Sequence, residues 1–222
     1  MKPSDLRLQT FLTRIPSGAP PAVAKNIETA LRLADRFHEK AAGIRSDANL
    51  SVQGKREQIL VVASNGFADH YGQLQKEAEK ALAGIAGEIG GLRKRAVDLL
   101  GEFPTGLQRE TRDYLRSLNE SERRRLVLET DEPLILASVL GAPSFLSGLN
   151  SEMYGYAEQR VVENAFGARL KELEVEHNAW ENAAAACEIA ANEIAREAEI
   201  TPEGFKKLTT PSGRSEAAKS RP

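Results

Sequence analysis

The residues most able to do chemistry in this sequence are its three histidines and the carboxylates that accompany two of them. Glu174 lies three positions before His177, and Asp35 lies three positions before His38. A Glu-x-x-His spacing places both groups on one helical face, as carboxylate-bridged di-metal sites require, and such sites need two pairs close together. On the register predicted below, His38 and His177 are about 24 Å apart along the helix axis, so one metal centre cannot hold both.

A smaller set, His70 with His177 and Glu181, is compatible with the same register. Two histidines and a carboxylate are ligand types that bind zinc. The alternative is that these histidines are polar side chains of the helical core. We favour this alternative because the sequence does not fix how the two helices are rotated. We therefore predict no catalytic, cofactor-binding or metal-binding residue.

The single cysteine, Cys187, lies in an apolar stripe between Ala184 and Ala191. A nucleophile needs a base within hydrogen-bonding distance, and His177 is about 15 Å away along the same helix. We therefore interpret Cys187 as a small buried hydrophobic residue. One cysteine also excludes an intrachain disulfide, so nothing requires an oxidising compartment.

Residues 83–91 contain four glycines but match neither a phosphate-binding loop nor a dinucleotide fingerprint. Glycine in a helix costs up to about 1 kcal/mol relative to alanine, so four together need a reason. We favour close packing against small residues of a facing helix, Ala165, Gly167 and Ala168. The alternative is that the glycines serve to make this segment of the helix flexible.

Basic residues gather in two places. One group is Arg93, Lys94, Arg95, Arg109, Arg112, Arg116, Arg123, Arg124 and Arg125. Neighbouring carboxylates offset most of them and few aromatics accompany them, so we expect a solvated, salt-bridged face rather than a nucleic-acid site. The other group lies within 206–222 and allows weak contact with nucleic acid or an acidic protein, although it is equally consistent with mere trailing sequence.

The elements that must position these residues are three helices, each with an apolar stripe at heptad spacing. The stripes run from Val23 to Ile44, from Leu60 to Leu99 and from Phe166 to Ala198. The first helix starts at the prolines near 21, the second spans 51–100 with Ser51 as its N-cap, and the third spans 151–200. No proline interrupts either long helix.

Residues 102–150 predict a small helical insert between the two long helices. Asn119 and Glu122 have the spacing of a capping box, and the apolar run 134–140 is expected to be buried. A helix over 106–118 is expected to direct five residues inward: Leu107, Thr111, Tyr114, Leu115 and Leu118.

These segment lengths predict an all-α protein, in which two long helices form an antiparallel hairpin or coiled-coil bundle. A third helix thickens the base, and the insert forms a small cap. The predicted divisions are an N-terminal arm and hinge, 1–20; two bundle helices, 21–101; the cap, 102–150; the long helix, 151–200; and a basic flexible tail, 201–222. In this register, residues 60–67 lie near 184–191.

Partners are expected for two reasons. Residues 1–15 and 206–222 are too poor in apolar side chains to form a core alone, so they should order only against another molecule. Five apolar residues off the main stripes also need covering, which predicts a homo-oligomer. They are Leu33, Val61, Val62, Val161 and Val162. No signal peptide or membrane-spanning run is recognisable, so we expect no membrane contact.

Two segments suggest a biological setting. Residues 132–149, EPLILASVLGAPSFLSGL, and the opening of the second helix at 50–57, LSVQGKRE, resemble segments of uncharacterised helical proteins of tailed phages and prophages. The resemblance implies a non-enzymatic virion or virion-assembly component, such as a scaffold-like, connector or internal protein. It would reside in the virion or host cytoplasm and bind itself and other virion proteins. The alternative is a bacterial cytosolic coiled-coil adaptor or chaperone.

Overall fold

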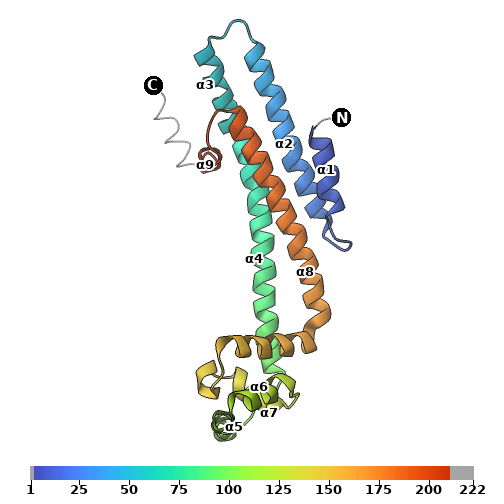
Figure 1. Ribbon diagram of the computed structural model, residues 1–222. Coiled ribbons are helices and arrows are strands. Elements are labelled where there is room, and N and C mark those ends of the chain that lie inside the picture. Colours follow the sequence, from blue (N-terminus) through green and yellow to red (C-terminus); the bar gives the residue numbers. More distant parts are fainter. Residues whose placement is uncertain (1–2, 211–222) are drawn as a thin grey trace. The chain divides into compact units, whose positions relative to one another are not determined.

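The computed structural model describes residues 3–210, which form helices and turns without a strand (Figure 1). The predicted all-α class is therefore confirmed. The chain divides into two compact units. Unit 1 contains the residues up to Gly84 and from Glu174 onward, and unit 2 is Ile85–Leu173. Helices α4 (Ala68–Asp98) and α8 (Ser151–Glu197) contribute residues to both units.

Unit 1 is a helical bundle built around α2 (Pro21–Ser46), α3 (Val52–Val62), the first turns of α4 and the last turns of α8 (Figure 1). Its core holds part of each of the three predicted stripes, with Phe37, Tyr71 and Ile194 completely buried. Cys187 joins this cluster, but the predicted register is shifted: Asn26 hydrogen-bonds both Cys187 and the Leu74 carbonyl oxygen, which places Cys187 nearer to residue 74 than to residues 60–67. The short side chains of the alanines in α8 allow its neighbours to approach closely.

The helix starts predicted at Pro21, Ser51 and Asn119 are confirmed. Pro21 occupies the first turn of α2. The Ser51 hydroxyl accepts a hydrogen bond from the Gly54 amide at 3.0 Å. Before α6 (Glu120–Glu129), Asn119 and Glu122 form both bonds of a capping box.

The second long helix is not continuous, contrary to prediction. Between α3 and α4, the segment Ala63–Phe67 contains a kink, at which Asn65 (φ −98°, ψ 99°) and Gly66 (φ 95°, ψ −47°) leave the helical region. No proline is responsible. Serine, asparagine and glycine are poor helix formers, and glycine adopts a positive φ without steric cost.

The third predicted helix is confirmed as α8, but it bends at Phe166, whose φ of −138° and ψ of 22° are not helical (Figure 1). The Arg95 guanidinium lies over the Phe166 ring, 5.6 Å from its centroid. The predicted stripe begins at Phe166 and gives no sign of the bend, because spacing records which positions are apolar and carries no information about one φ angle.

The N-terminal and C-terminal segments, which the sequence predicts to order only against another molecule, both pack against their own chain. Helix α1 (Pro3–Thr13) packs on α2 and buries Phe11. Helix α9 (Pro202–Lys207) places Phe205 in the core of unit 1, together with Leu208. The expectations of an N-terminal arm over 1–20 and a flexible tail from 201 are therefore wrong for 3–13 and 201–208. A single buried phenylalanine on each segment supplies the docking contact. Residues 211–222 lie outside the described residues.

Unit 2 combines the end of α4 and the start of α8 with the predicted insert. The insert contains α5 (Thr105–Ser117), α6, α7 (Pro133–Leu140) and a 3-10 turn at Ser144–Ser147. Arg169 donates to Glu88 at 2.8 Å and Arg93 lies 3.9 Å from Glu158, so α8 contacts α4 on both sides of its bend. The hydrogen bonds from Arg169 hold the pKa of Glu88 below its usual value. As predicted, most of α7 is buried.

The favoured interpretation of the glycines in 83–91 is contradicted. An added Cβ at Gly84, Gly87, Gly90 or Gly91 would meet no atom within 4 Å, and the same holds for Gly167. These positions therefore face open space, and no close packing of backbones explains them.

The residues expected to require a partner are largely covered within the chain. Leu33, Val161 and Val162 are buried, and Val61 and Val62 are half-buried. A helix that packs against more than one neighbour buries a wider face than one heptad stripe. These five residues therefore give no argument for self-association.

Candidate functional site

The histidines singled out by the sequence do not assemble into a metal site. His70 is exposed and its Nδ1 donates to the Gly66 carbonyl oxygen at 2.7 Å. The His177 side chain is 42% exposed and lies 3.7 Å from Glu181 on the same helix. Among residues 3–210, no group of three or more potential metal ligands occurs. The favoured interpretation as core histidines is also wrong, because both side chains reach the surface.

Cys187 is buried, as predicted, and its Sγ donates to Asn26 Oδ1 at 3.5 Å. Burial is the main reason that the pKa of its thiol is raised to about 12, so the thiol stays protonated at neutral pH. Asn26 in turn donates to the Leu74 carbonyl oxygen at 3.2 Å and to Glu77 at 3.1 Å. This buried polar group ties α2 to α4 and α8 and offers no reactive nucleophile.

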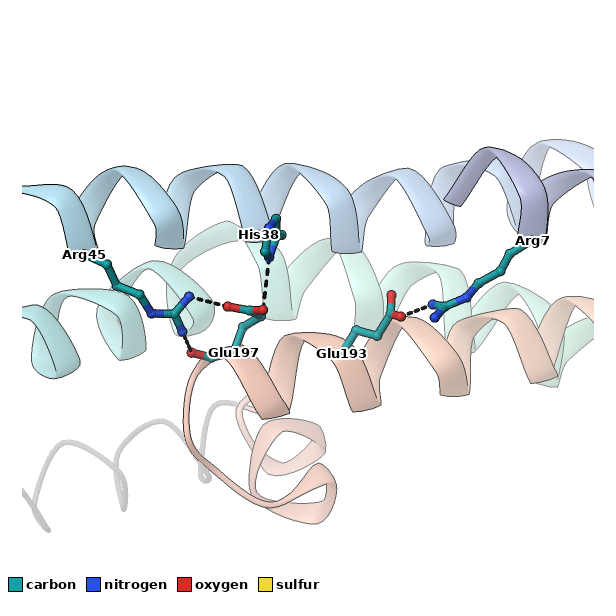
Figure 2. Close-up of polar contacts among 5 residues, drawn as sticks. All are labelled: Arg7, His38, Arg45, Glu193 and Glu197. Atoms are coloured by element: carbon teal, nitrogen blue, oxygen red, sulfur yellow. Dashed lines mark hydrogen bonds and ion pairs between the residues drawn. The ribbon is translucent and has the colours of Figure 1, made fainter. Parts of the chain in front are cut away.

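A row of ion pairs joins α1 and α2 to the last turns of α8 (Figure 2). Glu197 accepts hydrogen bonds from His38 Nδ1 at 3.0 Å and from Arg45, and one turn earlier Glu193 pairs with Arg7. Partial burial raises the pKa of Glu197, but the hydrogen bonds from Arg45 and His38 outweigh this effect, so the pKa lies below its usual value. His38 thus serves a structural ion pair, and Asp35 is not needed to explain it.

Two arginines of the predicted basic face point into unit 2 instead. Arg112 donates to the Ser138 carbonyl oxygen at 3.0 Å. Arg123 donates to the carbonyl oxygens of Leu115 at 2.8 Å and Leu118 at 2.7 Å. They donate to backbone carbonyl oxygens near the C-terminal ends of short helices, where the last turn leaves acceptors available. The expectation of a purely solvated face is therefore wrong for these two side chains.

The orientation of α5 follows from these bonds. Leu115 is completely buried and shares the inner face of α5 with Arg112, while Leu107 is 41% exposed and Tyr114 is 57% exposed. The prediction that Leu107 and Tyr114 point inward is therefore wrong. A helix turns about 100° per residue, so directing Arg112 and Leu115 inward turns Tyr114 away. An apolar stripe of α5, formed by Leu107, Thr111, Tyr114 and Leu118, consequently lies towards the surface, with Leu107 and Tyr114 exposed and Thr111 and Leu118 half-buried.

A hollow of about 410 Å³ lies beside this stripe, between α5 and α6. Tyr114, Leu118 and Leu126 form its apolar lining. Its polar lining is Glu122, Arg125, Glu129 and Thr130. Tyrosine and arginine are both enriched at protein interfaces, and Tyr114 and Arg125 lie together in this lining.

Unit 2 has a second hollow, of about 560 Å³, where α4 meets the first part of α8. Ile89, Val162 and Leu170 line it, together with Tyr156, which is 52% exposed. Among the described residues, five of the eight exposed large apolar side chains belong to unit 2. The five are Leu99, Leu107, Tyr114, Phe145 and Tyr156.

Known proteins offer no guide to this surface. Comparison with protein-family models, with curated proteins and with solved structures finds no match for the chain. None of the described helices has the length and apolar character needed to cross a membrane.

Proposed function

We propose that this chain is a non-enzymatic structural protein of a tailed-phage or prophage virion, or of virion assembly, and that it binds a second copy of itself through α5. One observation carries the interaction part of the proposal: α5 exposes Leu107 and Tyr114, with the half-buried Thr111 and Leu118 beside them. The setting rests on the resemblance of residues 132–149 and 50–57 to phage and prophage proteins.

The spacing of the residues in this stripe indicates that the binding partner of α5 is another helix. Leu107, Thr111, Tyr114 and Leu118 are separated by four, three and four residues, which is the spacing of a helix–helix seam. A second α5 presents the same stripe, so the two helices can pair about a two-fold axis, with each contributing the same surface. The hollow beside Tyr114 gives room for a side chain from the partner.

Replacing Tyr114 with glutamate tests this interaction. The substitution places a charge at the centre of the seam without touching the core, so we expect the wild-type protein to self-associate and Tyr114→Glu to be monomeric. Light scattering over a concentration series measures both. Val52→Glu is the matched control, because Val52 is 74% exposed in unit 1. A wild-type chain that stays monomeric at every concentration contradicts the α5 seam.

The biological setting needs a separate measurement. Mass spectrometry of purified virions and of assembly intermediates should detect the chain, and its absence from both would overturn the virion role. Recovery of the chain with host proteins instead would favour a bacterial adaptor or chaperone.

A further inference from the structure

Helix α9 covers a part of the unit 1 core that the proposed function does not use. The Phe205 ring packs against the Tyr71 ring with 5.4 Å between centroids, and Phe205 is completely buried. An added Cβ on Gly72 would lie 3.1 Å from the Thr209 side chain, so the turn after α9 also rests on α4. Six helical residues are too few to be stable alone, so α9 depends on these contacts for its structure.

The Tyr71 hydroxyl is buried without a hydrogen-bond partner. Tyr71 is completely buried, and no group among residues 3–210 forms a hydrogen bond with its hydroxyl. Burial is the main reason that the pKa of Tyr71 is raised, so the hydroxyl stays protonated and remains a donor. A buried donor without an acceptor costs the free energy of removing it from water. The closed structure therefore carries a cost that opening above Tyr71 would remove.

The connection from α8 to α9 carries a second cost. Glu199 has a φ of 55°, and it is the one described residue other than glycine with a positive φ. An L-residue is disfavoured in this left-handed region. The Ile200 amide donates to the Ala195 carbonyl oxygen at 3.0 Å, so hydrogen bonding to α8 fixes the bend. A hinge of four residues, 198–201, thus separates α9 from the end of α8.

Few contacts hold α9 in place. Its buried apolar side chains in the core of unit 1 are Phe205 and the following Leu208. At the surface, Lys206 donates to Glu188 at 2.8 Å, and an exposed ion pair of this kind contributes little in water. A segment with little buried apolar surface and a local cost at each end belongs to the parts of a protein that open below the free energy of global unfolding.

We infer that α9 is a releasable strap: residues 202–208 leave Tyr71 and redock as a unit, with 198–201 as the hinge, while the rest of unit 1 stays folded. Phe205 is the main contact that holds the strap closed, and water reaches the Tyr71 hydroxyl when the strap opens. The strap lies in unit 1, whereas the proposed self-association uses α5 in unit 2, so one can fail without the other.

Hydrogen exchange on the full chain tests the inference at single amides. The Phe205 and Leu208 amides are hydrogen-bonded when the strap is closed, and we expect them to exchange at least about tenfold faster than the Ile194 amide in α8. Tyr71→Phe removes the unpaired hydroxyl but keeps the ring, so it should slow exchange in α9 about tenfold. Equal rates at Phe205 and Ile194 in the wild-type chain, or no slowing in Tyr71→Phe, would refute the strap.

Tyr154→Phe is the matched control for the loss of a hydroxyl. The Tyr154 hydroxyl donates to the Leu140 carbonyl oxygen at 3.1 Å, so the same change there removes a hydrogen bond in unit 2. Exchange should quicken in α7 and stay unchanged in α9. Slower exchange in α9 with this variant would show that the effect of Tyr71→Phe is not specific to its hydroxyl, which contradicts the inference.

Phe205→Ala tests whether the strap opens separately from the core. We expect exchange in α9 to quicken at least about tenfold more than exchange at the Phe37 amide in α2, because the remaining helices keep their own contacts. Equal acceleration at both places would show that α9 is an inseparable part of the unit 1 core and that no strap exists.

Discussion

At the scale of single residues, the best-defined polar contact is the one around Glu197. Its side chain is 15% exposed and accepts hydrogen bonds from two helix-α2 side chains, His38 and Arg45. The folded state thereby holds the pKa of Glu197 below its value in the unfolded chain. The ionised carboxylate therefore stabilises the fold above the unfolded-state pKa of about 4.3, and this stabilisation is lost as the pH falls through the folded-state pKa.

Replacing Glu197 with glutamine should lower the free energy of unfolding by about 1–2 kcal/mol at pH 7, because charge-assisted hydrogen bonds are lost. The difference from wild type should disappear in acid, below both pKa values. Urea unfolding over a pH series measures it. Glu174→Gln is the control, because Glu174 is an exposed carboxylate on the same helix. A difference that stays constant with pH would show that ionisation of Glu197 does not stabilise the fold.

At the scale of helices, glycine has two opposite roles on the path from α3 to α4. Gly66 has a positive φ that ends one helix and allows the next to start, whereas Gly90 lies inside α4. Neither has an atom within 4 Å of where a Cβ would be, so steric crowding does not distinguish them. Only the backbone conformation distinguishes these two glycines.

Alanine at these two positions should therefore change stability in opposite directions. Gly66→Ala should cost about 1–2 kcal/mol, because an L-residue is strained at that φ. Gly90→Ala should stabilise the protein by up to about 1 kcal/mol, because alanine is the better helix former. Thermal unfolding of the two variants beside wild type measures both effects. Stabilisation by Gly66→Ala would mean that a continuous helix is compatible with the fold and that the break is not required.

At the scale of the whole molecule, the chain has two cores. Leu33 is 2% exposed in unit 1, and Leu115 is completely buried in unit 2. Each unit has a core of its own apolar residues. In unit 2, hydrogen bonds from Arg112 and Arg123 to backbone carbonyl oxygens also hold the helices together. Units with separate cores can open separately, so one unfolding free energy does not describe such a chain.

Core truncations should accordingly act locally. Leu115→Ala removes a buried side chain and should destabilise unit 2 by about 2–5 kcal/mol, while Leu33→Ala should do the same to unit 1. Hydrogen exchange should then quicken at the amides of α7 in the first variant and of α2 in the second. Each variant serves as the other's control. Equal acceleration in both helices with either variant would show that the units unfold together.

The sequence by itself determined the helical class, the main stripes and the local caps. Stripe residues such as Phe37 and Ile194 are buried because heptad spacing alone places them on one face. The capping box at Asn119 needs only residues three positions apart. Burial of Cys187 was likewise predictable from its place in a stripe. All of these features depend on neighbours in sequence.

Only the tertiary structure decided how each helix is rotated and where it breaks. The outward stripe of α5 depends on Arg112 finding a carbonyl oxygen in α7, 26 positions away. The break between α3 and α4 depends on the backbone angles of Asn65 and Gly66. The docking of α9 depends on room for Phe205 beside Tyr71, with 5.4 Å between ring centroids. The spacing of residues along the chain cannot specify the contacts of Arg112 and Phe205, because each joins groups that lie far apart in sequence and meet only when the chain has folded.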